Sequence, residues 1–287
     1  MTNPNWNLRY ASHLGYRSPD APLFPKSAGS INPIAQVEFA AALGLAGVQY
    51  ALAVTRPAAE VEKVASALTR YGLEAGCILY SEAQSLARLR WGSADLADQE
   101  ACRSALLNAI EVAKRLNAKT IAILSGVDPR LSTEMQIIQF AENLRGMADA
   151  TARAGVTLCL ETLSRRSLPG ILLGHIAEAY AIVKAVNHPA VRLIFDTSHV
   201  QIMDGDLLEN LRLTWDAIAI VQIADNPGRL EPGTGEINFD NLLRALHRGG
   251  YRGLVELEHN WSAPGQPTEQ CGIDNLRRMD GRLLEII

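Results

Sequence analysis

The stretch Leu193-Ile194-Phe195-Asp196 is a short apolar run that ends in a carboxylate side chain. Three other runs follow the same plan and also end in a side chain that is able to bind a metal: Leu158-Cys159-Leu160-Glu161, Ile220-Val221-Gln222 and Leu254-Val255-Glu256-Leu257-Glu258. Along the chain, the four terminal residues are separated by 35, 26 and 36 residues, which matches one strand and one crossover helix per step. In a closed parallel barrel the carboxyl ends of the strands converge on one rim. The runs therefore predict one oxygen-rich site that is built from four distant segments.

Short apolar runs alternate with helical patterns along the whole chain. Nearly continuous apolar sequence is typical of strands that are covered on both faces. The runs predict eight strands, at residues 8–12, 47–52, 73–79, 120–124, 156–160, 191–195, 218–223 and 253–257. The helical patterns cover residues 33–43, 57–71, 94–116, 133–154, 175–186, 207–214 and 239–248, with a last helix toward Ile287. Eight such units predict an α/β fold, a (β/α)8 TIM barrel that forms a single domain over residues 1–287.

An open doubly wound sheet is the alternative fold. Such a sheet more often carries a glycine-rich phosphate loop after its first strand. The first predicted strand continues into Ala11-Ser12-His13-Leu14-Gly15, which is not a loop of that kind. The sequence also contains no linker or low-complexity segment. We therefore favour the barrel.

Composition narrows the classes of function. The net charge is −4 and there is no run of lysine and arginine, which argues against nucleic acid as a partner. No uncharged apolar stretch approaches the roughly 20 residues that span a bilayer, so we expect no membrane partner. The N-terminal sequence does not resemble a secretory signal, and the four cysteines form no CxxC motif. We expect a cytoplasmic, reduced protein that acts on a small molecule, and the sequence leaves open whether it is a homo-oligomer.

The four terminal side chains are those of Glu161, Asp196, Gln222 and Glu258. Three carboxylates and one amide oxygen form a hard, oxygen-only set, which suits Mg²⁺ or Mn²⁺ better than a thiolate-rich zinc site. Three ionised carboxylates in one cavity would repel each other without a cation. We therefore predict a shared divalent metal site, and we expect Glu256, two residues before the last ligand, to lie deeper in the barrel with a polar partner.

Three segments resemble the hydroxypyruvate isomerase family, which belongs to the xylose-isomerase-like TIM barrels. They are Glu161 with Arg166 and Pro169-Gly170, then Asp196 with His199, and finally Gln222-Ile223-Ala224-Asp225-Asn226-Pro227-Gly228-Arg229-Leu230-Glu231-Pro232-Gly233-Thr234-Gly235-Glu236-Ile237-Asn238. The last segment is the most specific, and the resemblance covers residues 155 to 260. It implies that Glu161, Asp196, Gln222 and Glu258 hold a divalent metal and that Glu161 and Glu258 also move the proton. It further implies that His199, Arg166 and Arg229 line the substrate pocket.

The reaction that the resemblance implies fits these residues. Hydroxypyruvate and tartronate semialdehyde differ by a proton shift between neighbouring carbons through an ene-diolate. A metal that binds the adjacent oxygens would stabilise the developing negative charge, and carboxylates would remove and return the carbon-bound proton. We expect Arg166 or Arg229 to bind the substrate carboxylate and His199 to hydrogen-bond the shifting oxygen. The order in which Glu161 and Glu258 act is left open.

Four positions depart from the family pattern and leave the substrate open. Gln49 and Ala122 stand where a glutamate and a histidine are common, and Ser164 and Ser167 replace asparagine and aspartate. Polar changes of this kind can discriminate strongly between substrates. A 2-oxo-tetronate isomerase, a ketose epimerase and an inosose dehydratase-type enzyme are therefore alternatives on the same barrel. An apurinic-site endonuclease is disfavoured because six histidines are few for a cluster of zinc ions, and a non-catalytic sugar-acid binder would need no pair of proton carriers.

Overall fold

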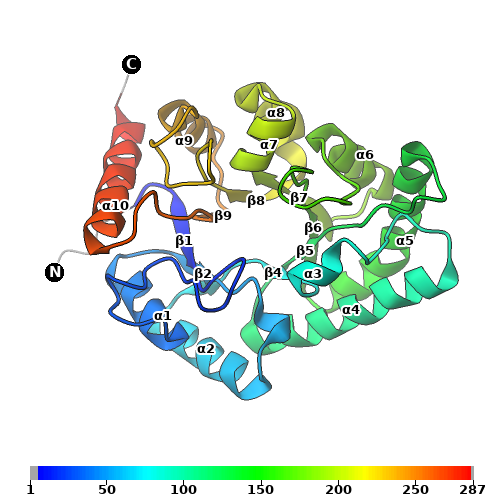
Figure 1. The fold of residues 1–287 in the computed structure, drawn as a ribbon, viewed down its shortest axis with the longest axis horizontal. Coiled ribbons are helices and arrows are strands. Elements are labelled where there is room, and N and C mark those ends of the chain that lie inside the picture. Colours follow the sequence, from blue (N-terminus) through cyan, green and yellow to red (C-terminus); the bar gives the residue numbers. More distant parts are fainter. Residues whose placement is uncertain (1–5, 286–287) are drawn as a thin grey trace.

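The computed structural model describes residues 6–285, which form one curled sheet of nine parallel strands surrounded by helices (Figure 1). The strand order is β3-β2-β1-β9-β8-β7-β6-β5-β4. The strands are β1 Arg9–His13, β2 Gly47–Gln49, β3 Glu74–Ala75, β4 Ile78–Leu79, β5 Thr120–Ile123, β6 Thr157–Leu160, β7 Val191–Asp196, β8 Ile218–Gln222 and β9 Leu254–Glu256. The chain has a TIM-barrel fold, so the predicted fold class is confirmed.

The nine strands correspond to the eight predicted ones because the third is divided in two. Strands β3 and β4 are the halves of the predicted strand at 73–79, and Gly76 and Cys77 lie between them. The first half pairs with β2 and the second with β5, so the barrel closes at this break. The backbone N–H of Cys77 donates a 2.6 Å hydrogen bond to Oε1 of Glu256. A Cβ atom on Gly76 would lie only 2.5 Å from the same oxygen, which explains why glycine is required there.

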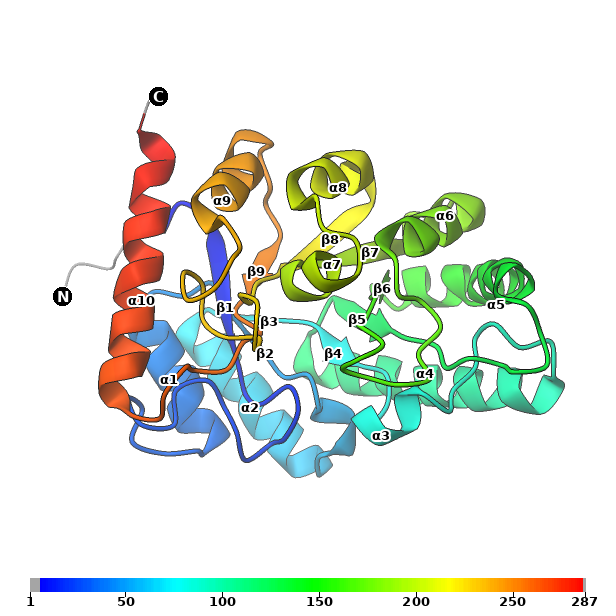
Figure 2. The same cartoon turned by 45° about the horizontal axis from the view of Figure 1, so that its top comes forward.

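The helices lie outside the strands. They are α1 Pro33–Ala42, α2 Ala58–Tyr71, α3 Ala83–Leu86, α4 Leu96–Leu116, α5 Thr133–Arg153, α6 Ile176–Val186, α7 Thr197–Met203, α8 Leu207–Thr214, α9 Phe239–Arg248 and α10 Gln266–Gly281, with short 3-10 turns at Ala53–Thr55, Trp215–Ala217 and Arg282–Leu284. The longer helices match the predicted ones, while the short α3 and α7 were not predicted. Helix α7 lies beside both α8 and β7 (Figure 2). The predicted end of the last helix, near Ile287, lies outside the described residues.

The two ends of the described chain are joined through one buried carboxylate. Asp280 of α10 accepts hydrogen bonds from the backbone N–H groups of Asn7 and Leu8 and from the hydroxyl of Tyr10. Helix α10 therefore packs beside β1, as Figures 1 and 2 both show. This contact fixes the first strand next to β9, whose carboxyl end carries Glu258.

The cysteines are free in this fold. Cys77, Cys102 and Cys159 are buried, as expected for structural thiols, and Cys271 is exposed on α10. Among the helices of residues 6–285, none is both long and apolar enough to cross a bilayer.

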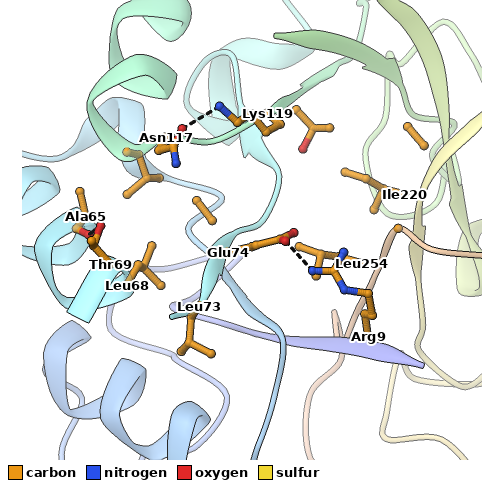
Figure 3. Close-up of a pocket in the computed structure, with 15 residues that line it drawn as sticks. Arg9, Ala65, Leu68, Thr69, Leu73, Glu74, Asn117, Lys119, Ile220 and Leu254 are labelled. Carbon is orange, nitrogen blue, oxygen red and sulfur yellow. Dashed lines mark hydrogen bonds and ion pairs between the residues drawn. The ribbon is translucent and has the colours of Figure 1, made fainter. Parts of the chain in front are cut away.

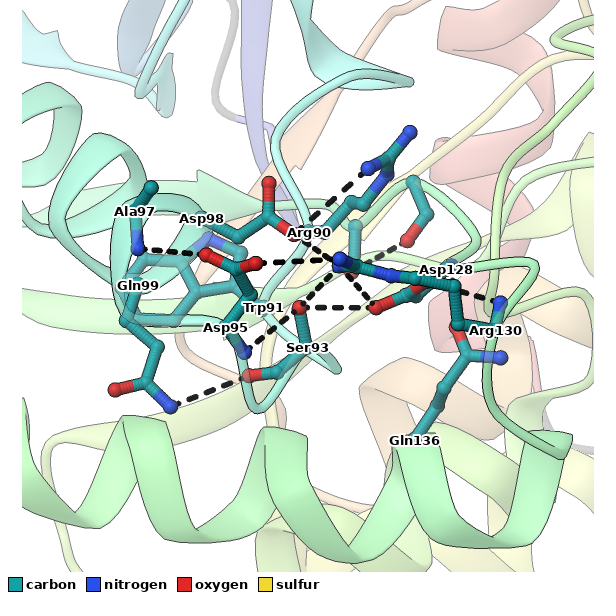
Figure 4. A network of polar contacts seen from close by, with 12 residues as sticks. Arg90, Trp91, Ser93, Asp95, Ala97, Asp98, Gln99, Asp128, Arg130 and Gln136 are labelled. Carbon is teal, nitrogen blue, oxygen red and sulfur yellow. Dashed lines mark hydrogen bonds and ion pairs between the residues drawn. The ribbon is translucent and has the colours of Figure 1, made fainter.

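A polar network ties together the loops that follow β4 and β5 (Figure 4). Arg130 donates hydrogen bonds to both oxygens of the buried Asp128, and it also pairs with Asp95 and Asp98. The hydroxyl of Ser93 donates to Asp128 at 2.9 Å. The hydrogen bonds from Arg130 lower the pKa of Asp128, and they outweigh burial, which acts in the opposite direction. The network fixes these loops on the same side of the barrel as the strand ends.

The lowered pKa of Asp128 predicts an acid-sensitive contribution to stability. A carboxyl group whose pKa is depressed on folding stabilises the protein above its ordinary value of about 4, and this contribution is lost as the pH falls further. We expect Asp128→Asn to reduce the free energy of unfolding near neutral pH, with the difference from the unsubstituted protein shrinking below about pH 4. Urea unfolding between pH 3 and pH 7 measures this difference. A difference that grows on acidification would contradict the assignment.

Candidate active site

A cavity of about 570 Å³ opens at the carboxyl ends of the strands. Five of the predicted site residues line it: Glu161, Arg166, His199, Arg229 and Glu258. Leucine side chains from four loops or strand ends form an apolar part of its wall: Leu79, Leu86, Leu124, Leu163 and Leu168. Tyr16, Arg17 and Ser167 complete the lining. The cavity therefore combines acidic, basic and apolar surfaces within one enclosure.

A second cavity of about 20 Å³ lies beside the glutamates, which also line it. Gln222 reaches this smaller cavity, together with Gln49 and Ala122. The volume is sufficient for one water-sized group. The predicted residues Glu161, Gln222 and Glu258 thus face one small space, although 97 residues separate the first of them from the last.

Asp196 ends β7 and also begins α7. Its Oδ1 accepts a 2.9 Å hydrogen bond from the backbone N–H of His199, which caps the helix. Both of its oxygens also accept hydrogen bonds from Arg229, at 3.1 and 2.6 Å. The same guanidinium donates to Oε1 of Glu258 at 3.1 Å. Arg229 therefore joins two of the predicted ligands, and its side chain is only 7% exposed.

The loop that carries Arg229 is organised by a single buried side chain. Asp225, which follows β8, accepts hydrogen bonds from the backbone N–H groups of Gly233, Gly235 and Ile237. Arg229 itself has a positive φ of 55°, a conformation that is rare for residues other than glycine. The most specific motif of the sequence, residues 222–238, is thus a loop whose internal hydrogen bonds hold Arg229 against the carboxylates.

Burial and mutual repulsion dominate the electrostatics of the acidic residues. Burial, with the nearby charges of Glu258 and Asp196, raises the pKa of Glu161 well above its ordinary value. The pKa of Glu258 is also raised by burial, although Arg229 opposes this shift. For Asp196, burial is the largest single effect and raises the pKa, but the combined interactions with Arg229 and His199 outweigh it, so the pKa is lowered. One arginine does not neutralise three buried carboxylates, so the charge balance of the site favours a further cation.

Gln222 presents an oxygen that suits a cation. Its amide nitrogen donates a 3.0 Å hydrogen bond to Oε2 of Glu256, and this contact fixes the orientation of the amide group. Its Oε1 is buried and has no hydrogen-bond partner among the described residues. An unpaired buried carbonyl oxygen is costly, and a metal ion would satisfy it. The residues present therefore fit a divalent metal, and Glu256 has the polar partner that we expected.

His199 is better suited to donate a hydrogen bond than to bind a metal. One oxygen or nitrogen atom from each of Glu161, Asp196 and His199 lies within 4.8 Å of the others. However, Nδ1 of His199 accepts a 3.1 Å hydrogen bond from the backbone N–H of Ser164. Burial lowers the pKa of His199 to about 4, so the ring is neutral and its proton lies on Nε2. A nitrogen that carries a proton cannot bind a metal, but it can donate to a substrate oxygen.

The four departures from the family pattern lie in or beside the cavities. The amide nitrogen of Gln49 donates a 2.9 Å hydrogen bond to Oε2 of Glu258. Ala122 lines the small cavity and Ser167 the large one. The hydroxyl of Ser164 accepts a hydrogen bond from the backbone N–H of Arg166. These positions are therefore placed to influence which substrate fits.

Tyr16 and Arg17 line the large cavity from the loop after β1, and neither was predicted from the sequence. Their position directly after the first strand end was the only signal in the sequence. His13, at that strand end, has a structural role instead. Its Nδ1 accepts a hydrogen bond from the N–H of Gly15, and its Nε2 contacts the carbonyl oxygen of His259.

A further cavity of about 360 Å³ lies near the opposite ends of the strands (Figure 3). Its polar contacts include an ion pair between Arg9 and Glu74 and a hydrogen bond from Lys119 to Asn117. Glu74 is its only carboxylate, so this cavity offers no set of metal ligands. The chemistry of the barrel is concentrated at the other end.

Comparison with known proteins agrees with this fold. The model of the xylose isomerase-like TIM barrel family matches residues 37–279. Hydroxypyruvate isomerase of Escherichia coli K12 is 33% identical over 183 residues, which cover 63% of this chain and 68% of that protein. The 2-oxo-tetronate isomerase of Pectobacterium atrosepticum is 31% identical over 224 residues, which cover 77% of this chain and 84% of that protein.

Solved structures show the same barrel. A crystal structure from Brucella melitensis, described as an AP endonuclease of family 2, is 30% identical with a TM-score of 0.77, and the match covers 92% of this chain and 96% of that one. The 3-keto-D-glucoside 4-epimerase of Escherichia coli is 20% identical with a TM-score of 0.74, covering 96% and 100%. The second likeness concerns the fold alone.

The position of Glu256 between Gln222 and the break at Cys77 leads to a prediction. Glu256→Gln replaces one of two hydrogen-bond acceptors with an amide that can only donate, so one buried donor loses its partner. We expect a loss of about 1–3 kcal/mol in the free energy of unfolding. Denaturant unfolding measures it, with the exposed Glu74→Gln as the control, for which the expected change is below about 1 kcal/mol. Equal effects of the two substitutions would show that Glu256 does not have this role.

Proposed function

The chain belongs to the xylose isomerase-like TIM barrel family as an isomerase of the hydroxypyruvate isomerase-like kind, and from this premise we propose its reaction. The enzyme moves a proton between adjacent carbons of a small hydroxy-oxo acid and converts hydroxypyruvate to tartronate semialdehyde through an ene-diolate. The observation that supports this proposal is a pair of buried glutamates, Glu161 and Glu258, that face one cavity beside the unpaired Oε1 of Gln222.

Four side chains would hold a divalent metal, Mg²⁺ or Mn²⁺: Glu161, Asp196, Gln222 and Glu258. Their oxygens form the hard donor set that these ions prefer. The metal, when bound, supplies electrostatic stabilisation of the negative charge that develops on the substrate oxygens. Glu256 supports the site indirectly, because it keeps the amide of Gln222 turned with its oxygen toward the cavity.

The proton transfers are assigned to the two glutamates. One carboxylate takes the proton from the carbon that bears the hydroxyl group, which leaves the ene-diolate. The resulting carboxylic acid, or the second glutamate, returns a proton to the neighbouring carbon. The hydroxyl proton passes to the former carbonyl oxygen, and Nε2–H of His199 donates a hydrogen bond to one of these two oxygens during the transfer. The leucine side chains of the cavity wall limit the access of water. Gln49 and Arg229 hold the two oxygens of Glu258 in place.

A 2-oxo-tetronate is the second candidate substrate. Two observations favour it: the cavity of about 570 Å³ has room for more than three carbons, and Ala122 leaves space beside the glutamates. The match to the 2-oxo-tetronate isomerase also covers more of this chain than the match to hydroxypyruvate isomerase. Ketose epimerisation and inosose dehydration use neutral substrates, and the arginines of the cavity make them less favoured.

Glu161→Gln and Glu258→Gln test the assignment of the proton carriers. Each substitution removes a titratable group but retains the shape of the side chain. We expect exchange of the carbon-bound protons of hydroxypyruvate or a 2-oxo-tetronate with D₂O to fall at least about 100-fold in either variant. Proton NMR follows the exchange, and thermal unfolding verifies the fold. Glu74→Gln, at the opposite end of the barrel, serves as the control. Exchange at an unchanged rate in both variants would refute the assignment.

Removal of divalent metal tests the proposed cofactor. Dialysis against a chelator is expected to abolish isomerisation, and Mg²⁺ or Mn²⁺ is expected to restore it. The metal should also raise the melting temperature of the chelator-treated protein, because a ligand that binds only the folded state stabilises it. Full activity after verified removal of all metal would eliminate this part of the proposal.

A further inference from the structure

Three arginines line the large cavity, and among residues 6–285 only Arg229 is paired with carboxylates. Both Nη atoms of Arg229 are engaged by Asp196 and Glu258. Its Nε is buried without a partner among residues 6–285. Movement of Arg229 toward a substrate carboxylate would break its bonds to two buried acidic groups, which is unfavourable. Arg229 is therefore better described as a positioning residue for the two carboxylates than as the group that binds an acidic substrate.

Arg17, in the loop after β1, lines the same cavity and contacts the same aromatic ring as Arg229. Its guanidinium carbon lies 5.3 Å from the centre of the Tyr16 ring, and that of Arg229 lies at the same distance from the same ring. The hydroxyl of Tyr16 accepts a 3.0 Å hydrogen bond from Asn260. The ring therefore has a fixed position and holds Arg17 at the cavity through a cation–π contact. Within the described part of the chain, Arg17 has no ion pair.

Arg166 lines the same cavity from the loop between β6 and α6. Its backbone N–H donates to Ser164, while its exposed side chain forms no ion pair with any residue of the range 6–285. Two unpaired guanidinium groups thus lie on loops at the open side of the cavity. The carboxylates Glu161 and Glu258, in contrast, are buried at the strand ends. The cavity is polarised, with an acidic floor and a basic entrance.

We propose that Arg17, together with Arg166, binds the carboxylate of the substrate and that Arg17 determines specificity for acids over neutral sugars. This inference rests on the proposed function of the same site. A guanidinium group forms charge-assisted, often bidentate hydrogen bonds with a carboxylate. The acidic floor repels the carboxylate, and the basic entrance attracts it. The two effects orient a hydroxy-oxo acid with its carboxylate outward and its reacting carbons toward Glu161 and Glu258.

The test compares two substrates that differ only at the end that the arginines would bind. Hydroxypyruvate carries a carboxylate where dihydroxyacetone carries a hydroxymethyl group. We expect Arg17→Gln to lower kcat/KM for hydroxypyruvate by about 10- to 100-fold, mainly through a higher KM, because uniform binding is lost. The preference for the acid over the neutral ketose should fall at least about tenfold. Arg17→Lys should restore part of this preference, because lysine returns the positive charge but not the planar guanidinium group that can form two parallel hydrogen bonds with a carboxylate.

Arg9→Gln is the matched control, because Arg9 lines the cavity at the opposite end of the barrel. It should change neither substrate's kinetics. Thermal unfolding of Arg17→Gln excludes a general loss of structure. If the unsubstituted enzyme converts hydroxypyruvate and Arg17→Gln retains the full preference for the acid, the assignment of Arg17 is overturned while the proposed function stands.

A binding measurement separates the two proposals in the remaining case, in which the enzyme converts neither substrate. Calorimetric titration of the Mg²⁺-supplemented protein with D-glycerate, and with glycerol as the uncharged counterpart, requires no catalysis. If the affinity for D-glycerate falls at least about tenfold in Arg17→Gln, the carboxylate site is supported, and only the proposed reaction is wrong. Equal affinities of D-glycerate for both proteins, or no binding to the unsubstituted protein, would overturn the carboxylate site.

Discussion

The carboxyl group of Glu256 connects the closure of this barrel to its chemistry. One of its oxygens accepts the N–H of Cys77 at the break in the third strand, and the other accepts the amide of Gln222. The first contact satisfies a backbone donor that strand pairing leaves free, which allows β3 and β4 to join the two edges of the sheet. The second contact turns the oxygen of Gln222 toward the glutamates. One fully buried group thus fixes both the frame of the site and one of its oxygen donors.

Arg229 organises the site in a way comparable to Glu256, because it also fixes two other polar side chains. Its guanidinium group holds Asp196 and Glu258 together, and the hydrogen bonds of Asp225 hold the loop that carries it. The long motif that identifies the family is, in physical terms, a rigid support for one buried cation. Because that cation is already paired, we assign recognition of an acidic substrate to Arg17 and Arg166, which have no ion pair within the described part of the chain. The charged groups that organise the site, Arg229 and its two carboxylates, are therefore different from the arginines to which we assign binding of the substrate.

The strand ends were predictable from the sequence because their chemistry is local. An apolar run followed by Glu161, Asp196 or Gln222 can be recognised without knowledge of the partner strands, and the spacing of the runs specifies parallel strands. Other features were missed for a physical reason. The division of the third strand at Gly76 depends on a glutamate 180 residues away in the sequence. The short helix α7 is capped by Asp196, a residue that was predicted only as a ligand.

The sequence by itself determined the barrel and the convergence of four oxygen-bearing side chains at one end, because alternating strands and helices bring all strand ends to the same rim. Only the tertiary structure decided how those side chains are paired. Gln49 of β2 donates to Glu258 after β9, and the backbone N–H of Ser164 leaves the proton of His199 on Nε2. Arg17 and Arg229 both line the cavity, but only Arg229 is paired there with Asp196 and Glu258 among residues 6–285. These contacts join segments that are remote in sequence, and they arise only when the barrel closes.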